Sequence, residues 1–115
     1  MALTEIELKR CEKSLAEFLE RRRPPVHLRD ELDLAYRIDG HNVEIFEIRQ
    51  DWKDHATKHE APVAKATFVR TKGVWKVLWM KRDLKWHGYE PNPEVKTLEA
   101  FLDVVDRDDF GCFYG

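Results

Sequence analysis

The sequence has 115 residues, of which 43% are hydrophobic and 37% are charged, and its formal net charge is −2. This length favours one domain, residues 1–115, that can build a core without disulfide bonds or metal. The charge excludes a global attraction to nucleic acid or anionic lipid. Two cysteines far apart follow no disulfide or zinc spacing, and no apolar run predicts a signal peptide or membrane span. We therefore expect a reduced, cytoplasmic protein.

A helix is predicted near the start of the chain. Thr4 can cap its N-terminus, and Glu7, three residues later, completes a capping box. Apolar residues then recur at steps of three and four, which is typical of a helix with one buried stripe. Pro24 ends this helix at about Arg23, because a residue that precedes proline avoids the helical conformation.

The middle of the chain predicts antiparallel strands. Alternation of apolar and polar residues indicates strands over residues 32–38 and 43–48, joined by a turn at Asp39 and Gly40. The polar segment 51–60 has no period and is interpreted as a loop or a short helix.

Three more strands are expected over residues 62–70, 74–81 and 84–90. Residues 71–73 fit a three-residue turn that has Gly73 in the left-handed conformation, and residues 82–83 fit a two-residue turn. A second helix follows the break at residues 91–93, capped either by Thr97 or by Asn92. These elements predict an α+β fold of two layers, with the N- and C-terminal helices packed on an antiparallel meander of about five strands.

The predicted turns set a register for the last three strands. One face would carry the rows Lys65–Trp79–Trp86 and Thr67–Val77–Gly88. Because helices approach a sheet closely, we expect them to cover the other face, which would carry the smaller side chains of Ala64, Ala66, Leu78 and Met80. The tryptophan face would then be at least partly open. A slip of one residue would exchange the faces of a strand.

Tryptophans and cations are concentrated in this region. Residues 63–87 carry seven Lys or Arg against one acid, whereas residues 88–109 carry seven acids against two bases. Flat rings stack on bases and ammonium groups attract phosphates, so the pattern predicts a binding surface. The predicted ligand-binding residues are Trp75, Trp79, Trp86, Lys65, Lys81 and His87. Alternatively, the rings form a second core under the 51–60 loop and the C-terminal tail.

Histidines offer two weaker candidates for chemistry. His87 lies among aromatic residues and could act as an acid or a base, but catalysis would need a carboxylate such as Glu44 or Glu47. His55 and His59 are four residues apart and could share a metal ion on a helix. No third ligand is evident, so we expect a solvated polar loop there and no metal site.

Four segments resemble a known family: residues 62–67, 74–79, 83–91 and 112–115. They are similar to a bacterial family of domains of unknown function, the one numbered 3024, and the similarity runs from Met1 to Gly115. The string Leu-Lys-Trp-His-x-Tyr-Glu-Pro is its most specific part. The resemblance implies a stand-alone cytoplasmic bacterial protein and lends no activity, cofactor or functional residue.

We therefore expect a small binding module rather than an enzyme, with single-stranded nucleic acid as its ligand. No cofactor and no membrane contact are expected. Two alternatives remain open. One is a protein-interaction or homodimerisation module that buries the same aromatic face, and the other is a small hydrolase centred on His87. The oligomeric state is left open.

Overall fold

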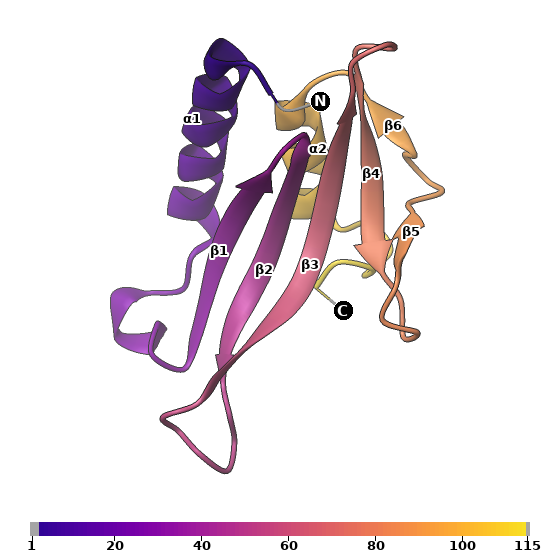
Figure 1. The fold of residues 1–115 in the computed structure, drawn as a ribbon. Helices are drawn as coiled ribbons and strands as arrows, with labels where there is room; N and C mark the ends of the chain where they lie inside the picture. Colours follow the sequence, from indigo (N-terminus) through magenta and orange to yellow (C-terminus); the bar gives the residue numbers. More distant parts are fainter. Residues whose placement is uncertain (1–2, 115) are drawn as a thin grey trace.

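The computed structural model describes residues 3–114, which form one antiparallel sheet with two α-helices on one side of it (Figure 1). The elements are α1 (Glu5–Arg22), a 3-10 helix η1 (Val26–Leu28), β1 (Leu32–Asp39), β2 (Asn42–Gln50), β3 (Lys58–Val69), β4 (Val74–Met80), β5 (Trp86–Gly88), β6 (Glu94–Val95) and α2 (Leu98–Arg107). The strand order is β1-β2-β3-β4-β5, and β6 also pairs with β4. The predicted α+β fold is confirmed.

Both helices begin where the sequence predicts. The hydroxyl of Thr4 accepts the Glu7 amide, and the Glu7 carboxylate accepts the Thr4 amide at 2.9 Å, so the capping box is present. Thr97 caps α2 by accepting the Ala100 amide at 3.0 Å. The alternative cap at Asn92 is wrong, because residues 94–95 form β6 instead.

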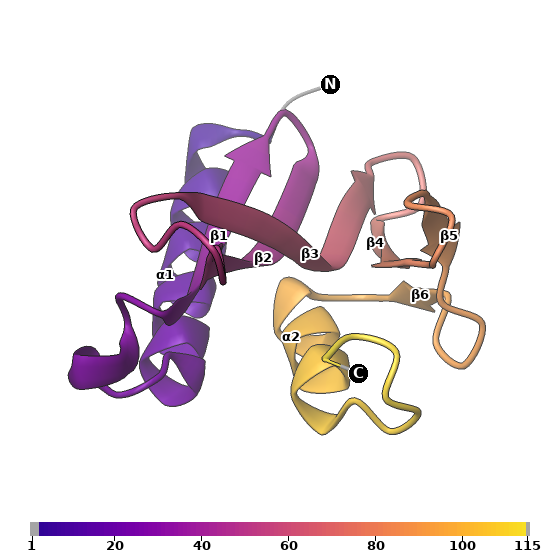
Figure 2. The same ribbon diagram turned by 90° about the horizontal axis from the view of Figure 1, so that it is seen from below.

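The core lies between the helices and the sheet. Figure 2 shows the curved sheet with α2 beneath it and α1 alongside β1. Apolar groups from both helices meet the same face of β1 to β4, and their burial supplies most of the driving force for folding. Fully buried members of this core are Leu15, Phe18, Val43, Ile45, Ala64, Ala66, Val77, Phe101 and Val105. None of the helices within residues 3–114 is long and apolar enough to cross a membrane.

The hairpin of β2 and β3 is longer than predicted. β3 begins at Lys58 rather than Pro62, so the loop is confined to residues 51–57; of the two predicted alternatives, the loop is confirmed and the short helix is wrong. Pro62 fits within the strand because the register shifts between Ile45 and Phe46, and proline is tolerated at such a bulge. The Asp51 carboxylate accepts backbone amides within the loop and holds its conformation.

The turn between β3 and β4 contains four residues instead of three. Val69 lies opposite Val74, and the Gly73 amide donates to the Val69 carbonyl at 2.8 Å. Gly73 has φ 64°, as predicted for a left-handed position. Arg70 therefore belongs to the turn, where its guanidinium lies 2.7 Å from the Glu7 carboxylate on α1.

The turn between β4 and β5 spans residues 81–85 instead of two residues, because Met80 lies opposite Trp86. Leu84 takes a left-handed conformation with φ 62°, and the Asp83 carboxylate accepts the Lys85 amide at 3.0 Å. The C-terminal tail docks on the body. Asp108 accepts the amides of Phe113 and Tyr114, and Phe113 is buried.

Candidate functional site

The observed register reverses the two faces of β4. Lys65 lies opposite Leu78 rather than Trp79, because the preceding turn is one residue longer than predicted. The next turn is also longer than predicted, and this second shift returns the side chains of β5 to their predicted faces. Trp86 therefore lies on the same face as Lys65. The predicted rows Lys65–Trp79–Trp86 and Thr67–Val77–Gly88 are therefore wrong.

The six predicted ligand-binding residues consequently divide between two faces. Trp75 is only 6% exposed and belongs to the core under the helices, where its ring centroid lies 5.0 Å from that of Phe68. Trp79 is half-buried and packs against the same core. The expectation of three rings on one open face is corrected, and the alternative of buried rings holds for Trp75, although helices rather than the loop cover it.

Two cation–aromatic pairs remain from the predicted set. Lys81 Nζ lies 5.4 Å from the Trp79 ring centroid, and Lys65 Nζ lies 5.7 Å from that of Trp86. The second pair is on the sheet face that no helix covers, which is the face toward the viewer in Figure 1. An ammonium over an indole ring at this range is attracted by the ring quadrupole.

We call the uncovered side of β3, β4 and β5 the open face. Leu78, Met80 and Trp86 lie on it, and each is half-buried, so apolar surface reaches solvent there. Lys65 and Lys76 flank these side chains. Five basic side chains lie on the open face or in the turn between β4 and β5, and none of them forms an ion pair with a residue between 3 and 114. They are Lys65, Lys76, Lys81, Arg82 and Lys85.

The β1–β2 half of the same sheet side differs in its charges. There Arg37 donates to Glu60 at 2.8 Å and to Glu44 at 3.4 Å. Its guanidinium also lies 4.6 Å from the Phe46 ring centroid and covers that ring. Opposite charges thus form ion pairs over β1 and β2. Lys65 and Lys76 of the open face form no ion pair within residues 3–114, although Glu44 and Glu94 lie opposite them in the sheet register.

His87 has a carboxylate partner, but not one of those predicted. Its Nε2 lies 2.8 Å from Asp83 Oδ2, and this hydrogen bond holds the pKa of Asp83 below its usual value. Glu44 pairs with Arg37 and Glu47 with Arg49, so these two glutamates are engaged elsewhere. The His87–Asp83 pair closes the turn between β4 and β5, and neither of the two pockets described in the structure contains it.

The histidines of the β2–β3 hairpin do not form a helical pair. His55 lies in the loop, and His59 lies on β3 with its Nε2 2.9 Å from Asp51 Oδ1. Among residues 3–114, no cluster of three or more His, Cys, Asp or Glu side chains could hold a metal ion.

Three residues of the open face, Lys76, Leu78 and Met80, lie outside the predicted site. The predicted register places Leu78 and Met80 on the covered side, because the predicted turn begins one residue too late. A usable signal was present in the chain: Val69 and Val74 flank the turn, and β-branched residues favour a closing strand pair.

A comparison with protein-family models gives one result. The model of the family described as "Domain of unknown function (DUF3024)" matches residues 3–115, nearly the whole chain. No curated protein and no solved structure matches. The match agrees with the resemblance carried by the segment around Trp86. The chain therefore belongs to the DUF3024 family.

Proposed function

We propose that the protein is a binding module and that its open face contacts single-stranded nucleic acid. The observation that carries the proposal is the Lys65–Trp86 pair on an uncovered sheet, among cations that form no ion pair within residues 3–114. Trp86 would stack on a base, and Lys65 and Lys76 would contact phosphates. Aromatic rings and lysines combined in this way bind strands with little sequence preference.

The distribution of acids supports the proposal despite the net charge of −2. The acid-rich segment includes α2, which lies on the opposite side of the sheet from the open face. Within it, Asp106 lies 3.2 Å from Arg21 and 3.3 Å from Arg22 of α1. The acids of α2 therefore lie away from the open face, whereas Glu44 and Glu94 border it. Local potential steers a polyanion more than net charge does.

The test is the binding of a labelled, mixed-sequence DNA or RNA oligonucleotide, followed by fluorescence anisotropy over a series of salt concentrations. Each lysine that neutralises a phosphate contributes about 0.7 to the slope of log affinity against log salt. Lys65→Gln and Lys76→Gln should each reduce that slope by about 0.7. Lys13→Gln, an exposed cation on α1, is the matched control and should leave the slope unchanged.

Tryptophan variants test the stacking contact separately. Trp86→Ala should weaken binding by about 1–3 kcal/mol, which is the range for loss of one stacked base. Trp52→Ala is the control, since Trp52 is 79% exposed in the loop of the β2–β3 hairpin and lies outside the open face.

Failure to bind at low salt, or equal losses in the two tryptophan variants, would overturn the proposal. A dimeric mass that Met80→Lys converts to a monomeric one would instead support the protein-interaction alternative, because Met80 lies on the open face.

A further inference from the structure

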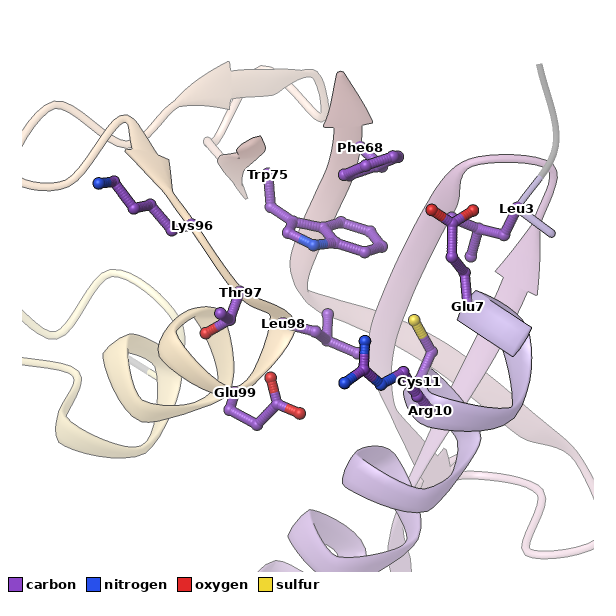
Figure 3. A pocket seen from close by; sticks show the side chains of 10 residues that line it. All are labelled: Leu3, Glu7, Arg10, Cys11, Phe68, Trp75, Lys96, Thr97, Leu98 and Glu99. Carbon is purple, nitrogen blue, oxygen red and sulfur yellow. The ribbon is translucent and has the colours of Figure 1, made fainter. Parts of the chain in front are cut away.

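A pocket of about 250 Å³ lies on the helix side of the sheet, away from the open face. It is formed where the first turns of α1 meet the end of β3, the start of β4 and the start of α2 (Figure 3). Its volume is somewhat below the range of about 300–1,000 Å³ that is typical for drug-sized ligands. Apolar and polar groups both line it: Leu3, Glu7, Arg10, Cys11, Phe68, Trp75, Lys96, Thr97, Leu98 and Glu99.

The aromatic wall of this pocket contains a hydrogen-bond donor without an acceptor. Trp75 is 6% exposed, yet its indole Nε1–H makes no hydrogen bond to any residue within 3–114. Figure 3 shows this nitrogen on the ring edge that faces the start of α2. This nitrogen is not one of the fully buried, unpartnered polar atoms of residues 3–114, so water reaches it. A ligand that supplies an acceptor would replace that water with an interaction that the protein alone does not make.

The carboxylates of the pocket are already engaged. Glu7 binds Arg70 at 2.7 Å, and this contact lowers the pKa of Glu7 to about 2. Glu99 accepts the Ser14 hydroxyl at 2.7 Å, which lowers its pKa from the ordinary value. Both glutamates are therefore ionised near neutral pH and are held by neighbouring groups of the protein.

The two cations that line the pocket are not engaged in this way. Arg10 and Lys96 form no direct ion pair or hydrogen bond with any residue of the described chain, 3–114, although the charge of Arg10 contributes to the lowered pKa of Glu99. Figure 3 shows the Arg10 guanidinium between α1 and the start of α2. A planar guanidinium with free donors is suited to bidentate recognition of a carboxylate.

Cys11 contributes apolar surface rather than a nucleophile. It is 5% exposed, and burial raises the pKa of its thiol to about 11. The neutral thiol is a poor nucleophile at physiological pH, because the thiolate is the reactive form. The pocket is therefore equipped to bind a ligand rather than to form a covalent intermediate through Cys11.

We propose that this pocket binds a small aromatic carboxylate. The ring would pack against Trp75 and Phe68, and the carboxylate would accept hydrogen bonds from Arg10 and from the free indole N–H. The ring supplies apolar contact area, and the anion satisfies both sets of donors at once. This site is independent of the proposed nucleic-acid surface, since it lies on the other side of the sheet.

The proposal is tested by titrating the ¹⁵N-labelled protein with 2-naphthoate and following the four tryptophan indole N–H signals. The signal that is absent in Trp75→Phe should move on titration, while that of Trp52 should not. Arg10→Gln should weaken binding about tenfold or more, as expected for loss of a charged hydrogen-bond donor. Lys13→Gln is the matched control on the same helix and should bind as the parent protein does.

Two further probes separate the roles of ring and charge. The uncharged 2-naphthamide should bind at least about tenfold more weakly than the carboxylate. Inorganic phosphate, which has no ring, should not displace 2-naphthoate at equal concentration. Equal affinity for the amide, displacement by phosphate, or no shift of the Trp75 signal at millimolar 2-naphthoate would each overturn the proposal. An oligonucleotide that leaves the Trp75 signal unchanged separates this result from the test of the open face.

Discussion

Val77 and Leu78 are neighbours on β4 that the structure places on opposite sides of the sheet. Val77 is fully buried beneath the helices, whereas Leu78 is half-buried on the open face opposite Lys65. The register predicted from the sequence gives the reverse arrangement. Alanine substitution at these two positions therefore distinguishes the two registers.

The expected losses follow from burial. Val77→Ala removes two carbons from a site with 0% exposure, so the transfer term is about 1.6 kcal/mol. The cavity left beneath the helices brings the loss to about 2–3 kcal/mol. Leu78→Ala removes three carbons, but this side chain is partly in water already, and we expect a loss of about 1 kcal/mol.

Urea denaturation followed by circular dichroism measures both losses. Thermal midpoints should fall by about 10 °C for Val77→Ala and about 4 °C for Leu78→Ala. Lysine variants widen the contrast, because Val77→Lys buries an unpaired charge and should abolish cooperative folding, whereas Leu78→Lys should fold. A larger loss for Leu78→Ala than for Val77→Ala would refute the observed register and return Trp75 and Trp79 to the open face.

Three further predictions concern the helix caps and turns. Arg70 lowers the pKa of Glu7 to about 2, so this ion pair stabilises the fold above the ordinary pKa of Glu7, and the stabilisation is lost as pH falls from about 4.5 to 2. The difference in thermal midpoint between the parent protein and Glu7→Gln should therefore be present at pH 6 and absent near pH 2. Glu5→Gln is the control. Gly73→Ala should cost about 1–2 kcal/mol in urea denaturation, because φ at this position is 64°. Asp108 has φ 41° and accepts the amides of Phe113 and Tyr114. Both Asp108→Ala and Asp108→Gly remove these hydrogen bonds, but glycine relieves the backbone strain, so the alanine variant should lose more free energy of unfolding. Equal losses would show that the strain is negligible.

The helices could be predicted from the sequence because their signals are local. Thr4 and Glu7 form a capping box within one turn, and Pro24 restricts the residue before it. The strands of the first hairpin follow from alternation and from Gly40, which has φ 62° as its turn requires. Each of these signals acts over a few neighbouring residues, so the local structure can be predicted without knowledge of the tertiary contacts.

The register of the later strands depends on contacts that are distant in sequence. Arg70 could continue β3 by its local pattern, but its ion pair with Glu7, sixty-three residues earlier, fits it into the turn. Leu84 adopts a left-handed conformation that its residue type disfavours, within a turn that Asp83 closes by hydrogen bonds to Lys85 and His87. Neither effect can be read from turn chemistry alone.

The shift of one residue changes which binding site each tryptophan can serve. On the predicted register Trp75 would stack on a ligand at the open face, and its N–H would meet solvent. In the structure the same ring forms a pocket wall, where its N–H has no acceptor within residues 3–114 and Arg10 supplies a cation nearby. Of the three tryptophans predicted for the open face, Trp86 lies on it. Oligonucleotide binding should therefore depend on Trp86 and not on Trp75, whereas binding of an aromatic carboxylate should depend on Trp75 and not on Trp86.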